Sequence, residues 1–417
     1  MAHGDRDSSR RRFRRLWAAY AVSTFGTWVA FDAFPLIAIL VLHAGPGAVA
    51  ALAAVGLAAG AVAALPLGPW IEFRSKRGVM VAMDLVRFCA LMSVPAAYAL
   101  GRLTFGQLVA VSVLVSTADI AFKAASGACL KGLVAPGDLL AASARLESTA
   151  WTATAVGPPL GGAAIGVLGP MTTVVANGVS FLLSAAGVRS IGGDEAIPAR
   201  PADARRMRAG DLLAGWRVIL GHPALRSLFL NTVLVNGLIL ASAPLLAVLM
   251  LGRLGFAPWE YGLAFGAPCV GGLVGSRLAG RCVARFGRDR VLRAAGTLRA
   301  CWPLGLAFVP AGPAGLALVL VLQFGLVTCV GVFNPVFAAY RLEQTPADRV
   351  ARTLSAWSVT SGLTVAGLTA IWGLLATVAG PRAAIAAAGV LLLATPLLLP
   401  RRHVFADDRR AAPVPVT

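Results

Sequence analysis

Two stretches of sequence decide the fold of this chain: GPWIEFRSKRGVMVAMDLVR at residues 68–87 and GRCVARFGRDRVLRAAGTLR at residues 280–299. Each begins with glycine, passes through a short basic cluster and then becomes apolar again. The positions that match at a constant offset of 212 are Gly68 and Gly280, Lys76 and Arg288, and Arg87 and Arg299.

A second pair of loops repeats at almost the same offset. LKGLVAPGDLLAAS (130–143) and YRLEQTPADRVART (340–353) match at an offset of 210, which pairs Pro136 with Pro346. Two equivalent loops at nearly one offset indicate that a bundle of about six helices has been duplicated. The alternative is that the loops are alike only because both are basic and lie on the same side of a membrane.

The composition indicates a membrane protein. Of the 417 residues, 58% are hydrophobic and 13% are charged, with a mean hydropathy of +0.78. Soluble domains are about 45–50% apolar and about 25% charged, so apolar residues here face lipid as well as one another. The net charge of +19 does not indicate a nucleic-acid partner, because no basic stripe can form across lipid-facing helices.

Apolar segments of about 20 residues, the length that spans a bilayer, recur along the chain. They predict an all-α membrane protein with twelve transmembrane helices, at residues 17–42, 47–68, 79–100, 104–122, 145–167, 171–190, 224–250, 259–279, 291–310, 313–333, 354–379 and 382–399. The predicted division is a basic arm (1–16), a first six-helix bundle (17–190), a linker (191–223), a second six-helix bundle (224–400) and a tail (401–417).

Basic residues are distributed unevenly between the gaps. Of 37 Lys and Arg residues, Arg102, Arg253 and Arg382 fall in short gaps on one side, and Arg87 and Arg299 lie inside apolar segments. All the others fall at the ends of the chain, in the alternate gaps, or within three residues of those gaps. Basic loops stay in the cytoplasm, so we expect both termini to be cytoplasmic. The abundance of Arg over Lys resembles high-GC bacteria, which suggests a bacterial plasma (inner) membrane.

The architecture resembles the major facilitator superfamily of secondary transporters over about residues 15–400. In that superfamily the loop after the second span carries the pattern GxxxDRxxRR. The matching positions here are Gly68, Glu72, Arg74, Lys76 and Arg77, with Glu for Asp and with Phe73 in place of the first Arg. The resemblance implies a charge latch that holds the two halves in one gating state. The alternative is a determinant of topology with no gating role.

Two further charged pairs have the spacing of neighbours on a helix. Asp84 and Arg87 are one turn apart near the expected cytoplasmic end of the third predicted span. Asp119 and Lys123 are four residues apart in the fourth. Such pairs meet along one helix face. We expect Asp84 and Arg87 to belong to the latch rather than to contact a substrate, and Glu147, at the start of the fifth span, to have a similar surface or latch role.

A narrower resemblance covers residues 121–162, which are similar to the stretch leading into span five of the macrolide-efflux and enterobactin-exporter branch. The stretch ends in GPPLGG (157–162), which matches the GPxxGG pattern of the superfamily's exporters. Pro158 and Pro159 remove backbone donors and bend a helix. Two small-xxx-small pairs allow close helix contact, and these are Gly157 with Gly161 and Gly162 with Gly166. Ordinary packing in an Ala- and Gly-rich chain is the alternative.

Asp32 is the sharpest single candidate for function. It lies about fifteen residues, or ~22 Å, along the first predicted span, with no basic residue within four positions. A charge at that depth costs ~2.5–3.5 kcal/mol, so Asp32 should face a cavity or a partner. Burial raises a carboxyl pKa toward neutrality, which predicts that Asp32 couples proton entry to substrate exit. A structural Asp, or one that binds a cationic substrate, remains the alternative.

The uncharged polar residues Asn231, Asn236 and Gln323 also lie in predicted spans. We expect them to line the substrate cavity, although hydrogen bonding between helices is equally cheap. The cysteines and histidines are dispersed, and no phosphate loop, HExxH or GxSxG motif occurs. The sequence therefore predicts no metal, no cofactor and no enzyme.

The function that these features favour is proton-coupled export of a bulky amphipathic small molecule, such as a drug, a secondary metabolite or a siderophore, by alternating access. The partners would be that small-molecule substrate, protons and the lipid bilayer, with no nucleic acid, and the chain is expected to be a monomer. Two alternatives stay open. One is uptake of a nutrient or lipid, and the other is a membrane scaffold or sensor that transports nothing.

Overall fold

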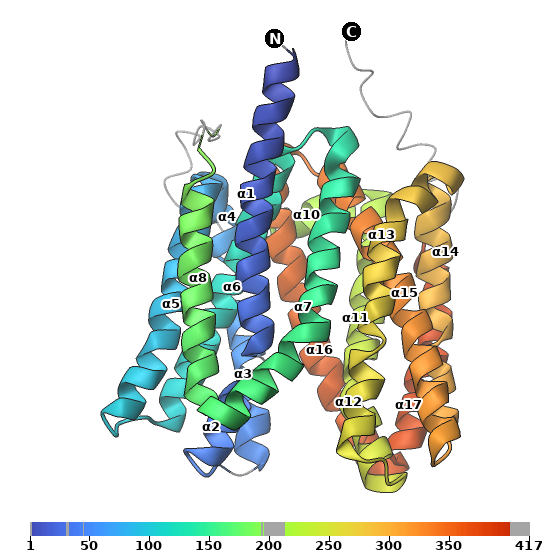
Figure 1. Cartoon of the computed structure of the whole chain (residues 1–417). Coiled ribbons are helices and arrows are strands. Elements are labelled where there is room, and N and C mark those ends of the chain that lie inside the picture. The colour runs from blue at the N-terminus through green and yellow to red at the C-terminus, as the bar shows by residue number, and fades with distance from the viewer. Residues whose placement is uncertain (1, 31–32, 45, 193–194, 196–212, 401–417) are drawn as a thin grey trace. The chain divides into compact units, whose positions relative to one another are not determined.

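The computed structural model describes residues 2–30, 33–44, 46–192, 195 and 213–400 (Figure 1). The described residues are helical almost throughout, and none of them lies in a β-strand. Nine of the helical segments within these ranges are long and apolar enough to cross a membrane, judged by length and composition. The predicted fold class, an all-α membrane protein, is confirmed.

The chain divides into two compact units that do not follow the predicted boundary between the bundles. Unit 1 contains residues 1–142, 149–216 and 345–363, and unit 2 contains residues 143–148, 217–344 and 364–417. The start of the predicted fifth span, 143–148, therefore packs in unit 2. The start of the predicted eleventh span packs in unit 1.

The helices that begin in unit 1 are α1 (Ala2–Val29), α2 (Ala33–Leu40), α3 (Pro46–Ala63), α4 (Leu67–Glu72), α5 (Lys76–Ala99), α6 (Phe105–Leu133), η1 (Pro136–Asp138), α7 (Leu139–Leu168), α8 (Pro170–Arg189), α10 (Ala214–Gly221), η4 (Ala347–Arg349) and α16 (Val350–Ala379). Helix α5 packs against both α6 and α8, and α8 packs in turn against α1 (Figure 1). Buried Ile37, Leu91, Leu108 and Phe181 form part of the core between them.

Unit 2 contains α11 (Pro223–Ala247), η2 (Val248–Arg253), α12 (Pro258–Gly266), α13 (Cys269–Phe286), α14 (Arg288–Cys301), η3 (Pro303–Phe308), α15 (Pro313–Gln344), α17 (Pro381–Ala394) and η5 (Thr395–Leu398). Helix α15 packs against both α13 and α14, and α17 packs against η3 and α11. The core of unit 2 includes Leu238, Leu246, Val319 and Ile385, each almost fully buried.

Glycine and proline set matching helix boundaries in the two repeats. Gly169 ends α7 with φ = 81°, and Gly380 ends α16 with φ = 85°. A proline follows each of them as the first residue of the next helix. Glycine adopts this left-handed conformation without a Cβ clash, and proline suits the first turn because its missing N–H would be unpaired there anyway.

The helices differ from the predicted spans at several points. Helix α1 begins within the predicted arm and ends at Val29, and α2 begins at Ala33, with residues 31–32 outside the described part of the chain. The ninth predicted span is divided, because α14 ends at Cys301 and a 3-10 turn begins at Pro303. The predicted linker contains one short helix, α10, that sequence periodicity did not indicate. The predicted tail, 401–417, and residues 196–212 lie outside the described part of the chain.

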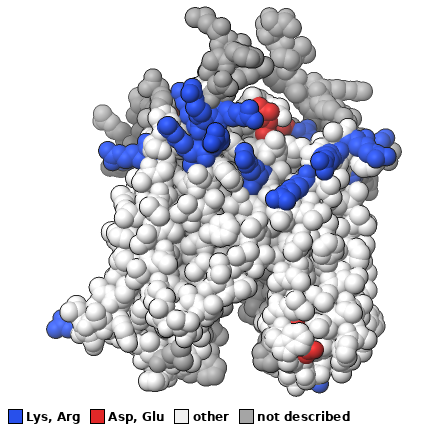
Figure 2. All heavy atoms as spheres, in the orientation of Figure 1, with Lys and Arg blue, Asp and Glu red and all other residues white. Residues whose placement is uncertain are grey.

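Basic side chains gather at one end of unit 1. Figure 2 shows Lys and Arg around the region where α1 begins, whereas most of the visible helix surface carries no charge. This end of unit 1 is also where α4 and the start of α5 bring the loop of residues 68–78 to the surface. The clustering agrees with the uneven distribution of basic residues in the sequence.

Candidate functional site

The loop of residues 68–78 packs directly against the start of α16. A Cβ added to Gly68 would lie 3.1 Å from Cβ of Ser355 and 3.3 Å from Cα of Arg352, so α4 and α16 touch at their backbones. Four residues later on α4, Glu72 forms an ion pair with Arg352 and is only 5% exposed. A carboxylate from the loop after the second predicted span therefore binds an arginine from the loop before the eleventh predicted span, and both lie in unit 1.

Burial changes the acidity of Glu72. Removal from water raises its pKa to about 7, although Arg352 lowers it through charge and hydrogen bonding. Asp348 raises the pKa of Glu72 further, and Lys76 lowers it. Desolvation outweighs the arginine because the charged form of a carboxyl loses most when it leaves water.

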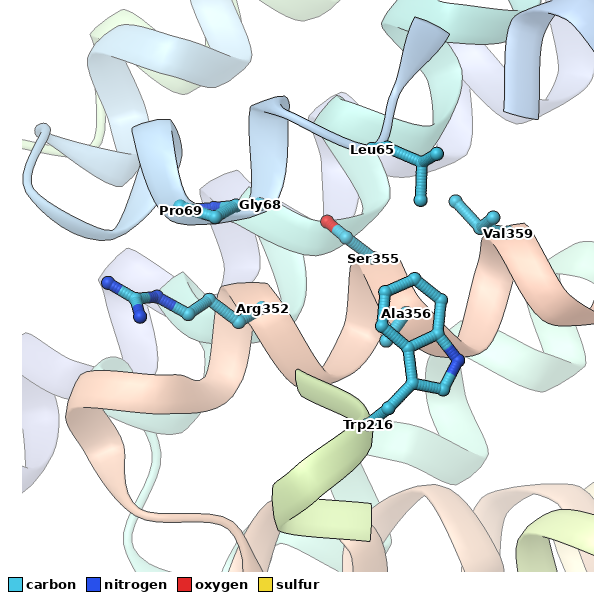
Figure 3. A pocket seen from close by; sticks show the side chains of 8 residues that line it. All are labelled: Leu65, Gly68, Pro69, Trp216, Arg352, Ser355, Ala356 and Val359. Atoms are coloured by element: carbon cyan, nitrogen blue, oxygen red, sulfur yellow. The ribbon is translucent and has the colours of Figure 1, made fainter. Parts of the chain in front are cut away.

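A small cavity lies beside this contact. Its volume is about 10 Å³, roughly that of one water probe, and Figure 3 shows the lining side chains Leu65, Gly68, Pro69, Trp216, Arg352, Ser355, Ala356 and Val359. Trp216 reaches α16 by donating its indole N–H to Thr360 at 2.9 Å. Ser355 Oγ is buried and finds no hydrogen-bond partner among the described residues. The interface between α4 and α16 is thus close-packed but holds one polar gap.

The other basic residues of the loop act locally. Lys76 Nζ donates to the carbonyl oxygens of Glu72 and Arg74 at 2.6 and 2.8 Å. Arg74 lies over the ring of Trp70 at 4.9 Å, and Arg77 donates to the carbonyl of Gly192 at 2.6 Å. Within the predicted latch motif, Gly68 and Glu72 contact α16.

Sequence reasoning missed a carboxylate that holds this loop. Glu195 accepts hydrogen bonds from Ser75 Oγ at 2.7 Å, from the backbone N–H groups of Lys76 and Arg77, and from Arg77 Nε at 3.3 Å. Burial raises the pKa of Glu195, but these hydrogen bonds outweigh burial and hold the pKa below its usual value. The stretch containing Glu195 has no helical or repeat pattern, so nothing in the sequence pointed to this partner.

The predicted pairs in spans three and four form and join into one network. Arg87 pairs with Asp84 and lies 3.3 Å from Asp119 Oδ1, while Lys123 Nζ lies 2.7 Å from Asp119 Oδ2. Asp84 is fully buried and Arg87 is 3% exposed. The guanidinium also lies between the rings of two phenylalanines, Phe122 at 4.5 Å and Phe181 at 4.1 Å. The pairing is confirmed, and its part in gating stays a prediction.

The three uncharged polar candidates do not come together. Asn231 is fully buried, donates to the carbonyl of Thr395 at 2.8 Å and accepts from Arg299 at 2.6 Å. It therefore joins helices inside unit 2 instead of lining a cavity, which corrects the prediction. Asn236 is exposed and Gln323 is half-buried.

The GPPLGG segment packs against α1, as its first glycine pair predicts. A Cβ on Gly157 would lie 2.5 Å from Cβ of Trp28, and one on Gly161 would fall on the carbonyl oxygen of Val29. The second predicted pair is wrong as a close contact, because a Cβ on Gly162 or Gly166 would meet nothing within 4 Å.

Helix α7 continues through Pro158 and Pro159 as one helix that changes direction along its length (Figure 1). The predicted bend therefore leaves the helix unbroken. Asp32 itself lies outside the described residues, between the end of α1 and the start of α2. The close contact of Gly161 with Val29 brings α7 to within three residues of Asp32 along the chain.

In unit 2, the start of α7 makes polar contacts with α13 and α15. Asn334 donates to Glu147 at 2.8 Å, and the hydroxyls of Ser148 and Ser276 are 2.6 Å apart. Ser276 on α13 is fully buried. The sequence had assigned Glu147 only a surface or latch role, without a partner.

A second cavity, open on one side, lies in unit 2 and has a volume of about 620 Å³. It is bounded by the break between α12 and α13, by the break after α14, and by α15. Its lining residues are Ala267, Pro268, Trp302, Leu320, Val321, Phe324, Gly325, Thr328 and Cys329. The size and apolar lining are those of sites for drug-sized molecules. Among the described residues, no cluster of His, Cys, Asp and Glu could hold a metal ion.

Comparison with known proteins supports a transport fold. The sequence model of the Major Facilitator Superfamily matches residues 16–328 and 234–414. A bacterial homologue of the iron transporter ferroportin, in an outward-facing state, is similar with a TM-score of 0.78 at 17% identity, covering 93% of this chain and 98% of that one.

Two other solved structures share the fold. The human organic anion transporter MFSD10 has a TM-score of 0.70 at 16% identity, with 94% and 99% of the two chains covered. The fucose:proton symporter of E. coli has a TM-score of 0.65 at 14% identity, with 94% and 98% covered. No curated protein matches the sequence. At these identities the solved structures indicate the fold alone.

Proposed function

We propose a specific activity from the premise that this chain belongs to the Major Facilitator Superfamily and is a membrane transporter. The proposed activity is export of a bulky amphipathic small molecule, driven by protons that move in the opposite direction. The protein would lie in the plasma membrane of a bacterium with both termini in the cytoplasm. Two states that expose one binding site to opposite sides in turn would carry out the transport.

The contact between α4 and α16 is the observation that carries this proposal. Glu72 and Arg352 belong to different sequence repeats, yet they pair in one compact unit. Alternating access requires contacts between repeats that form in one state and break in the other. A buried ion pair beside the close approach of Gly68 and Ser355 is such a contact, since it is lost as soon as the first turns of α16 move away.

A proton step at Asp32 supplies the driving force in this proposal. Asp32 lies in an apolar stretch with no basic residue within four positions, so a charge there needs a cavity or a partner. Gly161 of α7 packs on the carbonyl of Val29, three residues before Asp32 in the sequence, which supports a coupling between this part of the chain and α7. The apolar cavity of about 620 Å³ and the export-like sequence of 121–162 support a bulky, partly apolar substrate.

The test is transport of ethidium, an amphipathic fluorescent cation, into proteoliposomes that contain the purified full-length protein. With an acidic lumen, we expect dye accumulation that collapses when the pH gradient is dissipated. Asp32→Asn should abolish the response to the gradient. Gly161→Ala should reduce it strongly because the added methyl meets the α1 backbone, whereas Gly162→Ala, the matched control on the same helix, should transport normally.

The outcomes also separate the competing functions. Gradient-driven transport that survives Asp32→Asn unchanged would refute the proton role of that residue. Accumulation of a nutrient or lipid by cells, with no ethidium export, would indicate uptake instead. Absence of flux for a broad panel of compounds under either gradient would favour a scaffold or sensor.

A further inference from the structure

The first helix carries an unusual concentration of positive charge just before it becomes apolar. Within the stretch SRRRFRR (residues 9–15) five of seven side chains are arginine. Helix α1 continues without interruption from this stretch into the predicted first span. The charges are therefore fixed to a helix at a defined distance from the apolar segment, and they are not part of a loop.

That distance matches the headgroup layer of a bilayer. Leu16, 1% exposed, is the first buried apolar residue of α1 after the arginines. Arg10 precedes it by six residues, which is about 9 Å along an α-helix. The polar layer on each side of a bilayer is about 5–8 Å thick. If the hydrocarbon begins near Leu16, the stretch 9–15 crosses the layer that holds the lipid phosphates.

The described residues provide no carboxylate partner for these arginines. Arg10, Arg11, Arg14 and Arg15 are exposed, and Arg12 is half-buried. No ion pair joins any of the five to a carboxylate in the part of the chain that the structure describes. Arg15 donates to the backbone carbonyl of Ser190 at the end of α8, which anchors the stretch to its neighbour.

The charged residues of the nearby loop already have partners. Arg77 is paired with Glu195, and Lys76 is bound by backbone carbonyls. The described arginines without a carboxylate partner in this part of unit 1 therefore include those on α1, near which Figure 2 shows basic side chains close together. An anion that approaches unit 1 in the plane of the headgroups meets this stretch without displacing an existing ion pair.

We propose that residues 9–15 of α1 form a binding surface for the headgroups of anionic phospholipids. Guanidinium groups bind phosphate oxygens through paired hydrogen bonds, which an ammonium group cannot do. Basic clusters that flank a transmembrane helix attract anionic lipids. A lipid is a better occupant than a soluble polyanion because α1 becomes apolar from Leu16 onward, and a helix that enters the hydrocarbon there holds the arginines at the level of the lipid phosphates. The inference does not depend on the substrate or direction of transport.

The test is retention of phosphatidylglycerol by the full-length protein in nanodiscs that contain phosphatidylcholine and phosphatidylglycerol in equal amounts. The variant Arg10→Gln, Arg11→Gln, Arg14→Gln leaves Arg15 and its bond to Ser190 intact. We expect it to lower the ratio of retained phosphatidylglycerol to phosphatidylcholine by about fivefold or more, because each basic residue near an anionic surface contributes several-fold to binding. The corresponding Arg→Lys variant should retain most of the charge effect.

A matched control removes the same charge elsewhere. Arg281, Arg285 and Arg290 are exposed arginines of unit 2, on α13 and α14. Their replacement by Gln should change the lipid ratio less than twofold. An equal loss in both triple variants would show that overall charge, not a site on α1, attracts the lipid, and would overturn the proposal.

Two further measurements keep the test decisive. Thermal unfolding in zwitterionic lipid checks that each variant is folded. If the triple Gln variant is not, the single variants Arg10→Gln and Arg11→Gln replace it, and each should lower the lipid ratio by about twofold or more. Raising the salt concentration should lower lipid retention by the wild type, because salt screens exposed charges. Displacement of phosphatidylglycerol by millimolar inorganic phosphate would indicate a general anion site and would contradict lipid recognition.

Discussion

The two repeats keep the same arginine in their third helices but surround it differently. Arg87 in unit 1 and Arg299 in unit 2 match at the offset of 212, and both are almost completely buried. Arg87 pairs with Asp84 and Asp119. Arg299 instead donates to Asn231 and lies 3.6 Å from the ring centroid of Phe333, and no carboxylate pairs with it among the described residues.

The difference extends to the loop that precedes each arginine. At the same offset Glu72 corresponds to Ala284, and Asp84 corresponds to Gly296. Unit 2 therefore keeps a basic residue at Arg288 and Arg299 and lacks both of these carboxylates, while Phe286 and Asp289 stand at the positions of Arg74 and Arg77. In unit 1 each carboxylate has a basic partner in the fold, Arg352 for Glu72 and Arg87 for Asp84.

The basic residue at the loop end also differs in its partners. Lys76 donates to carbonyls of its own loop, whereas the matching Arg288 pairs with Glu343 on α15 and lies 4.9 Å from the ring of Tyr340. In unit 2 the loop is thus held by a helix of its own repeat. In unit 1 it is held by α16, from the other repeat. If a charge-dependent gate exists, as we propose, this asymmetry places its charged contact in unit 1.

The largest effect is expected at Arg87. Arg87→Met removes one partner of a buried ion pair and leaves Asp84, fully buried, without its counter-charge. Breaking a buried pair in this way costs about 3–5 kcal/mol. The free energy of unfolding in mixed micelles, measured by titration with sodium dodecyl sulfate, checks the value.

Lys123→Met is the matched control for this network. The lysine pairs with Asp119, but its side chain is 64% exposed, and exposed pairs contribute about 0–1 kcal/mol. Similar losses from the two variants would mean that burial does not set the strength of this network, and the contrast with unit 2 would fail.

A smaller loss is expected at Asn231, which takes the place of a carboxylate beside Arg299. Asn231→Leu removes the oxygen that accepts from Arg299 Nη2 and the amide that donates to Thr395. A buried donor left without a partner costs about 1–3 kcal/mol. The same unfolding titration measures it, with Asn236→Leu as the control at an exposed position of the same helix. If Asn231→Leu is neutral for stability but abolishes transport, Asn231 is a cavity residue after all.

Much of the fold and the local contacts of the site can be predicted from the sequence, but the long-range partners cannot. The repeat, the helical class, the pairing of Asp84 with Arg87 and the contact at Gly157 and Gly161 all follow from local spacing or from a constant offset. The length of the apolar segments marks where the helices lie, because lipid-facing and buried residues are both apolar along a membrane span.

The partners of the loop could not be predicted in the same way. Arg352, Trp216 and Glu195 are more than a hundred residues from the loop in sequence, and no local pattern links them to it. Asn231 was misread for a related reason. A polar residue in a span has the same sequence signature whether it faces a cavity or another helix, and only the position of Arg299 and Thr395 distinguishes the two.

The pH dependence of the α4–α16 contact gives a sharper test of unit 1. Burial raises the pKa of Glu72 from its ordinary value of 4.5 to about 7. An acid whose pKa is raised in the contact favours that contact when protonated. The stabilisation is therefore complete below about pH 4.5, is lost as the pH rises through about 7, and stays lost above that. Glu72→Gln, which imitates the protonated acid, should keep the contact closed at pH 8.

Cys129 offers a native reporter of this opening. It is 7% exposed on α6 and interacts electrostatically with Lys76 and Arg77 at the loop. At pH 8 a thiol reagent should modify Cys129 several-fold faster in the wild type than in Glu72→Gln, and at pH 5 the two rates should be equal. Comparing variants at one pH cancels the effect of pH on the thiol itself. Glu343→Gln, which removes the carboxylate that pairs with Arg288 in unit 2, should not alter the ratio, and a constant ratio at both pH values would contradict the gate.

The smallest effect is expected at Arg299, and it decides whether the two arginines really differ. Arg299→Met loses a hydrogen bond to Asn231 and a contact with Phe333, but it also removes a guanidinium that is 1% exposed and has no carboxylate partner among the described residues. The relief of desolvation offsets the lost contacts, so stability should stay within about 1 kcal/mol of the wild type.

The double variant Asn231→Leu, Arg299→Met should then be more stable than Asn231→Leu alone, because no buried donor is left unpaired. A loss above about 3 kcal/mol in the single variant, as large as that of Arg87→Met, would mean that Arg299 is compensated as strongly as its counterpart, and the charge asymmetry between the repeats would have no energetic basis.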